Sequence, residues 1–214
     1  MKAVIGVLCG TIFLWFFVGV SNAQDIEKKF GVGGRLAYYD ISDDQVSDLT
    51  LEWTQSLLYE GLVTYCFTKS FSLELVGGYT ETDLSRVEQG ISSDEFGELK
   101  QFPVLLNARY VFWPSSEIGI YIGGGVGYYF NDFNLTDKSK SAFPGLVVEM
   151  DDSFGYQVIG GVEFFLNDKV SINWDARYTW NKADYVERSP GSPEEQFEVD
   201  LNAFTFALGI KYYF

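Results

Sequence analysis

Charged side chains stand at alternate positions in segments whose other positions are apolar, and this spacing limits the chemistry they can do. Eight of them share this placement, four acids and four bases: Arg35, Glu60, Glu74, Arg109, Glu163, Asp175, Arg177 and Lys211. A buried charge without a partner is unfavourable, so equal numbers of both signs indicate ion-paired networks in an interior.

The sequence contains no histidine. General acid–base and nucleophilic catalysis most often use histidine as the base. We therefore expect no enzymatic activity and no catalytic residue, and no cofactor is predicted. The acidic residues of the long links could hold divalent cations that bridge lipopolysaccharide phosphates, but none of their spacings matches a defined calcium-binding loop, so we expect no metal site. The formal net charge of −15 repels phosphate, so nucleic acid is not expected as a partner.

The elements that position these charges are predicted to be β-strands, because apolar residues recur at every second position. In the run 204–214, Phe204, Phe206, Leu208, Ile210, Tyr212 and Phe214 share one face. The alternation recurs over about 30–39, 56–67, 71–80, 101–112, 118–130, 154–166 and 170–180. None of these apolar faces carries a charge, as a lipid-facing surface requires, since a lipid-facing arginine or lysine near the midplane costs about 2–4 kcal/mol.

The links between these strands alternate between short and long. Links near 68–70, 113–117 and 167–169 are short, whereas those at about 40–53, 81–99, 131–153 and 182–199 are long and polar. Aromatic residues at strand ends would form two interfacial girdles: Tyr38, Phe67, Phe71, Phe112, Trp113, Phe130, Phe154, Trp180 and Phe214. A soluble sandwich would not need such residues at both ends. We predict an all-β fold, an eight-stranded antiparallel outer-membrane barrel with short periplasmic turns and long extracellular loops.

The first 23 residues have the composition of a secretory signal peptide. A lysine precedes an uncharged apolar stretch, and Ser21 and Ala23 occupy the small-residue positions before a cleavage site. A retained transmembrane helix is the alternative, since the stretch is nearly long enough to span a bilayer. We expect cleavage after Ala23 and a barrel domain over 24–214 in the outer membrane of a Gram-negative bacterium.

Two stretches of the second half carry distinctive motifs. The first is the tyrosine- and glycine-rich segment 120–130, IYIGGGVGYYF. The second runs from DSFG at 152–155 through GGVEFFLN at 160–167 to NWDARY at 173–178. Both stretches resemble the OmpW family of eight-stranded outer-membrane proteins, and the resemblance covers about 100–214. It implies a narrow channel with an apolar lumen that passes small hydrophobic molecules.

Inward positions also include apolar side chains that would line part of the lumen: Leu58, Leu62, Leu105, Val111, Ile159, Phe165 and Leu201. We expect a narrow passive channel for small hydrophobic molecules. The alternative is a non-conducting structural or adhesion barrel, like the OmpX or Opa proteins, that acts through its extracellular loops. The inward charges then form either a structural plug or a selectivity filter. The expected partners are outer-membrane lipid, lipopolysaccharide, small hydrophobic solutes and, through the terminal Phe214, the barrel-assembly machinery.

Overall fold

The computed structural model describes residues 25–42, 44–46, 49–88, 91–190 and 195–214. The predicted signal peptide and its cleavage site lie outside these residues. Among the described residues, no helix has the length and apolar character to cross a bilayer.

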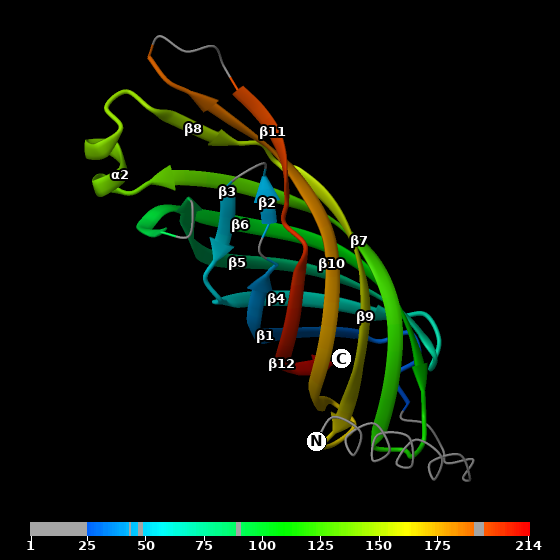
Figure 1. The fold of residues 1–214 in the computed structure, drawn as a ribbon. Coiled ribbons are helices and arrows are strands. Elements are labelled where there is room, and N and C mark those ends of the chain that lie inside the picture. The colour runs from blue at the N-terminus through cyan, green and yellow to red at the C-terminus, as the bar shows by residue number, and fades with distance from the viewer. Residues whose placement is uncertain (1–24, 43, 47–48, 89–90, 191–194) are drawn as a thin grey trace, which may run out of the picture.

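Eight antiparallel strands form a closed barrel, as predicted (Figure 1). Each strand pairs with the next in the order β1, β4, β5, β6, β7, β9, β10 and β12, and β12 pairs back onto β1. Their bounds are β1 (Phe30–Ile41), β4 (Ser56–Cys66), β5 (Phe71–Glu88), β6 (Ile91–Phe112), β7 (Ile118–Leu135), β9 (Ser153–Phe165), β10 (Val170–Arg188) and β12 (Ala203–Tyr213).

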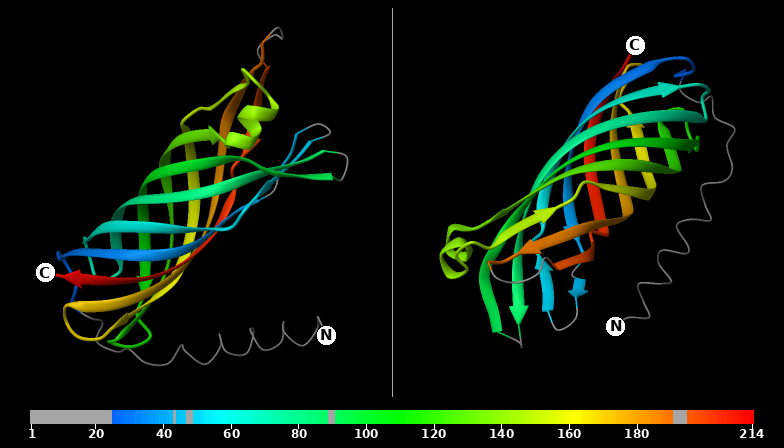
Figure 2. Two further views of the ribbon diagram at one scale, coloured as in Figure 1. Left: turned by 90° about the vertical axis from the view of Figure 1, so that its left-hand side faces the viewer. Right: turned by 90° about the horizontal axis from the view of Figure 1, so that it is seen from above.

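The short connections share one end of the barrel with the C-terminus (Figure 2). Side-chain oxygens tighten two of them. The hydroxyl of Thr68 accepts hydrogen bonds from the backbone N–H groups of Ser70 and Phe71, and the amide oxygen of Asn167 accepts from those of Lys169 and Val170. Asparagine and threonine favour turns for this reason. By the pattern of bacterial barrels, this end is periplasmic.

The outer surface of the barrel is an apolar band. Leu57, Leu75, Leu106, Trp174 and Ile210 are among its large, exposed side chains. The predicted girdle residues Phe67, Phe71, Phe112, Phe130 and Phe154 also point outward.

Trp113 corrects the predicted girdle. Its indole N–H donates to the backbone oxygen of Lys69, and its ring packs against Phe165 below the lumen. Because Trp113 follows the last residue of β6, the strand alternation no longer determines where its side chain points.

The regions predicted to be long polar loops are largely strand, which corrects that expectation. β5, β6, β7 and β10 continue well beyond the apolar band, and further elements join them: β2 (Asp44–Val46), β3 (Leu49–Trp53), α2 (Asp137–Ala142), β8 (Val147–Met150) and β11 (Glu195–Asp200). β2 and β3 extend the sheet at β5, whereas β8 and β11 both pair with β10. All project from the end opposite the short turns (Figures 1 and 2). We call them the extracellular extension.

The barrel wall is weakened where β4, β5 and β6 meet. Pro103 in β6 has no N–H to donate, and the β5–β6 ladder passes from Gly77 opposite Val104 directly to Thr80 opposite Gln101. The β4–β5 ladder ends at Tyr59 opposite Tyr79. Among the described residues, the backbone of β5 therefore pairs only with β4 at Gly78 and Tyr79 and only with β6 just above. There, the Ser56 hydroxyl of β4 still hydrogen-bonds to the hydroxyls of Thr80 and Thr82 in β5. We call this place the wall seam and define it by Leu58, Gly78, Thr80 and Pro103.

Candidate functional site

All eight charged residues expected to face the lumen lie buried inside the barrel, none more than 6% exposed. Alternation along each strand places them there, because the same strands present their apolar faces to lipid. Each has an ion-pair partner within the set. We call Arg35, Glu60, Glu74, Arg109, Glu163, Asp175, Arg177 and Lys211 the ionic layer.

Glu74 lies at the centre of one half of the ionic layer. Its carboxylate is 3.0 Å from Nη1 of Arg35, 3.1 Å from Nη1 of Arg109 and 3.0 Å from Nζ of Lys211. The hydroxyl of Thr64 donates to the same group at 3.1 Å. One acid from β5 therefore joins bases carried by β1, β6 and β12.

Arg35 connects this half to the other. Its Nε is 2.9 Å from Oε2 of Glu60, and its Nη1 is 2.9 Å from Oδ2 of Asp175. The hydroxyl of Tyr121 donates to Asp175 at 3.2 Å, and the guanidinium of Arg109 stacks 5.0 Å from the Tyr121 ring centre. An eight-stranded barrel is just wide enough for side chains to fill, so this layer fills the lumen at its level.

The seven apolar residues predicted to line the lumen are all buried but belong to four separate clusters. Leu58 and Leu201 lie in the cluster nearest the extension, and Leu62 and Leu105 pack with Val76 and Tyr129. Val111 and Ile159 pack around Tyr121. Phe165 packs with Ile26, Cys66 and Tyr213. The ionic layer interrupts the apolar lining, so the wall is not continuous from end to end.

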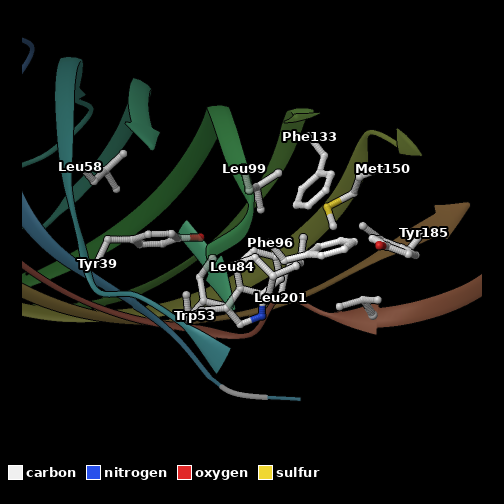
Figure 3. Packing of buried hydrophobic residues seen from close by; sticks show 14 of the residues in the cluster. Tyr39, Trp53, Leu58, Leu84, Phe96, Leu99, Phe133, Met150, Tyr185 and Leu201 are labelled. Carbon is white, nitrogen blue, oxygen red and sulfur yellow. The ribbon is translucent and has the colours of Figure 1, made fainter. Parts of the chain in front are cut away.

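The largest of these clusters fills the upper lumen and the inside of the extension (Figure 3). We call it the apolar upper cluster. Its buried members are Ala37, Tyr39, Ile41, Trp53, Leu58, Leu84, Phe96, Leu99, Phe133, Leu135, Val148, Met150, Ala183, Tyr185, Val199, Leu201, Ala203 and Ala207. It begins inside the barrel at Leu58 and Tyr39 and reaches Met150 and Tyr185 in the extension.

Between the apolar upper cluster and the ionic layer lies a cavity of about 10 Å³. We call it the lumen cavity. Its polar lining residues are Tyr39, Thr80, Gln101, Tyr129, Gln157, Arg177, Thr179 and Thr205, and the apolar ones are Leu58, Pro103 and Leu105. Three of these, Leu58, Thr80 and Pro103, also belong to the wall seam.

The polar side of the lumen cavity is held by a chain of hydrogen bonds. The Tyr39 hydroxyl donates to Oε1 of Gln101 at 3.0 Å, and Nε2 of Gln101 donates to Asn131 at 2.9 Å. The hydroxyl of Thr179 donates to Gln157 at 3.3 Å. The sequence places Gln101 and Gln157 on inward faces but does not indicate that they line one cavity, because they lie on β6 and β9, which are not adjacent.

In the extension, charged residues lie outside and pair at the surface. Nζ of Lys182 donates to Glu198 at 2.5 Å and lies 3.4 Å from Asp200. These hydrogen bonds to the two carboxylates raise the pKa of Lys182. A hydrogen bond to Glu98 likewise raises the pKa of Lys100. The charge pattern of the extension is therefore that of a water-exposed surface.

The fold and the interior define an eight-stranded bacterial outer-membrane β-barrel. The model of the family described as outer membrane protein beta-barrel domain matches residues 11–214. The chain belongs to that family, and its place is the bacterial outer membrane.

The sequence comparison supports the predicted similarity to the OmpW family, and the structural comparison shows a shared fold. Outer membrane protein W of Vibrio cholerae is 26% identical over 157 residues, which cover 70% of each protein. The solution structure of Escherichia coli outer membrane protein W has 22% identity and a TM-score of 0.56, covering 89% of this chain and all of that one.

A third comparison concerns the fold. The crystal structure of outer membrane protein OprG from Pseudomonas aeruginosa superposes with a TM-score of 0.79 and 19% identity. It covers 90% of this chain and 99% of the other. The architecture is therefore shared over nearly the whole length of both proteins.

Proposed function

We propose that the protein is a narrow passive channel that admits small hydrophobic molecules from the outside and releases them sideways into the membrane. The observation that carries this proposal is the apolar upper cluster, which continues from the extension to Leu58 at the wall seam. A hydrophobic molecule entering between these side chains exchanges one apolar environment for another, so entry requires no loss of hydrogen bonds.

The ionic layer argues against a straight path to the periplasm. A hydrophobic molecule passing there would separate buried ion pairs, and a buried charge that loses its partner costs about 3–5 kcal/mol. For ions the same packing leaves no open path, so we assign the layer a structural role rather than that of an ion filter.

The wall seam provides the sideways exit. Around Gly78 the strands lack part of their ladder, and the space is filled by the ends of side chains. A Cβ atom at Gly78 would lie 3.0 Å from Cδ1 of Leu58 and 3.1 Å from Cγ of Pro103, with the backbone oxygen of Tyr59 at 3.3 Å. Rotation of Leu58 opens the wall seam without breaking a hydrogen bond between β5 and β6, because the ladder between these two strands is interrupted at Gly78 and Pro103.

Uptake by intact cells tests this function, since lipopolysaccharide makes their outer membrane a barrier to apolar molecules. The rate for a straight-chain hydrocarbon is compared in cells with and without the protein, and ionic conductance is measured in planar bilayers. We expect faster uptake together with conductance near that of the bare bilayer. Uptake equal to that of cells without the protein would contradict the proposal.

The second candidate is a non-conducting surface barrel that acts through its extension. The exposed side chains of Phe143 and Val147, 54% and 47% exposed, favour it, because they present apolar surface to a binding partner far from the barrel. Cells lacking uptake but adhering through the protein would support this candidate. In either case, the absence of histidine supports a role other than catalysis.

A further inference from the structure

The lumen cavity differs from the rest of the solute path because one side of it is polar. Gln101, Gln157 and Thr179 line it together with Leu58 and Leu105. Its volume, about 10 Å³, is close to what a single water molecule needs. The cavity therefore has room for one oxygen atom, and an apolar body attached to it would have to occupy the place that Leu58 leaves when it rotates at the wall seam.

Arg177 lines this cavity and carries hydrogen-bond donors that have no acceptor in the part of the chain that the structure describes. The residue is 2% exposed. Its Nη1 lies 2.8 Å from Glu60 and its Nε forms an ion pair with Asp175 at 3.5 Å, but among the described residues neither Nε nor Nη2 has a hydrogen-bond partner. A buried donor without an acceptor is unfavourable, so an acceptor in the cavity is favoured.

The charge balance of the ionic layer determines which acceptor fits. Its four bases and four acids are already paired with one another, and the Arg177 charge is compensated by Glu60 and Asp175. A carboxylate in the cavity would add an uncompensated negative charge in a region shielded from water. A neutral oxygen, in a hydroxyl or a carbonyl group, adds none.

We propose that the lumen cavity is a head-group site for small hydrophobic molecules that carry one neutral oxygen, such as aliphatic alcohols, aldehydes and ketones. The oxygen accepts a hydrogen bond from Nη2 of Arg177, and the hydrocarbon lies against Leu58 and Leu105 toward the wall seam. This inference rests on the proposed channel function and names the class of molecule that the channel holds best.

Hexanol, hexane and hexanoate test this site in lipid nanodiscs containing the whole barrel with labelled leucine methyl groups. The NMR signals of Leu58 and Leu105 are followed at equal solute concentrations in the lipid. We expect a saturable shift with hexanol and responses about tenfold weaker or more with the other two solutes. Hexane lacks the hydrogen bond to a charged group, and hexanoate brings an uncompensated negative charge into the interior. An equal response to hexane, or a stronger one to hexanoate, would overturn the proposal.

Arg177→Lys sharpens the test because lysine retains the charge but not the fork of guanidinium nitrogens. Hexanol affinity is expected to fall about tenfold in this variant. Arg109→Lys is the matched control, since Arg109 does not line the cavity, and it should bind hexanol as the wild type does. Unchanged affinity in folded Arg177→Lys would overturn the assignment.

The comparison of solutes on the wild-type barrel needs no variant and decides the matter if Arg177→Lys does not fold. The proposed function fails separately from this site. Hydrocarbon uptake without a preference for hexanol removes the head-group site alone, whereas saturable hexanol binding without cellular uptake removes the channel.

Discussion

The membrane-spanning barrel and the extracellular extension are built from the same continuous strands, but their polarity is opposite. Within the apolar band, β10 directs Trp174 outward and buries Asp175. Further along the same strand it directs Asp184 outward and buries Tyr185. The backbone alternation is unchanged, and only the surrounding solvent differs. Lipid selects apolar side chains on the outside, whereas water selects them on the inside.

This reversal of polarity explains why the interior has two different fillings. In the membrane-spanning part, lipid surrounds the apolar outer face, and the interior holds the ion-paired charges of the ionic layer. In the extracellular extension, the outer face is charged and exposed to water, and the apolar upper cluster forms the interior that stabilises it. The lumen cavity lies where the two fillings meet.

Removing one acid from the ionic layer should have the largest effect. Glu74→Leu leaves Arg35, Arg109 and Lys211 without their shared carboxylate, and the free energy of unfolding should fall by about 3–5 kcal/mol. Urea titration of the refolded barrel in lipid measures this change. Glu81→Gln is the control, because Glu81 lies at the surface beside Lys100 and should leave the unfolding midpoint nearly unchanged. Similar effects of both variants would contradict the structural role of the layer.

Truncating the core of the extension should have the next largest effect, but a local one. Leu99 is fully buried, and Leu99→Ala should destabilise its surroundings by about 2–5 kcal/mol. We expect faster proteolysis within the extension, while the barrel still migrates as a folded species in unheated gel samples. Loss of that folded band would show that the substitution also unfolds the barrel, and it would contradict a local effect confined to the extension.

An arginine introduced on the outer face should have different effects in the two regions. Leu106→Arg places a charge on the lipid face and should cost about 2–4 kcal/mol. Asp184→Arg makes the corresponding outward change in the extension, where water solvates it, and should have little effect. The two unfolding free energies, measured in the same lipid, test the difference between the regions directly, and equal values would contradict it.

The smallest effect concerns a surface ion pair. The pKa of Lys182 is raised in the folded protein, so its stabilising effect is complete below the ordinary lysine pKa of about 10.4 and is lost as pH rises through the folded-state value. Because the pair is exposed, salt screens it and its contribution is small. Amide exchange in β11 at neutral pH should therefore be insensitive to Lys182→Met at high salt and change only slightly at low salt. A large change at neutral pH and high salt would show that this ion pair holds β11 against β10 and would contradict the expectation.

The fold of the membrane-spanning part could be predicted from the sequence because lipid leaves a strict pattern. Six apolar residues alternate from Phe204 to Phe214, and none of the other outward faces carries a charge. The strands of the extension could not be predicted in this way because their pattern is inverted. In the run from Lys182 to Val186, the apolar Ala183 and Tyr185 point inward and the charged residues point outward. A prediction that looks for strands with an apolar outward face therefore assigns this run to a polar loop.

The site was predictable only in composition. Alternation places Arg35, Glu60 and Asp175 in the interior, but which of them meet depends on how the strands are staggered around the barrel. Pairing at the wall seam depends on Pro103 and on ladders with two neighbouring strands, which no single segment reveals. The lumen cavity likewise brings together side chains from non-adjacent strands, such as Gln101 and Gln157.

The most direct test of the sideways route compares two glycines on neighbouring strands. Gly78→Leu fills the wall seam between Leu58 and Pro103, whereas Gly61→Leu adds the same side chain on the lipid face, where nothing lies within 4 Å of the added Cβ. Hydrocarbon uptake is measured in cells with equal amounts of folded barrel. We expect Gly78→Leu to lower uptake to the level of cells without the protein and Gly61→Leu to preserve it. Wild-type uptake through folded Gly78→Leu barrels would contradict the route.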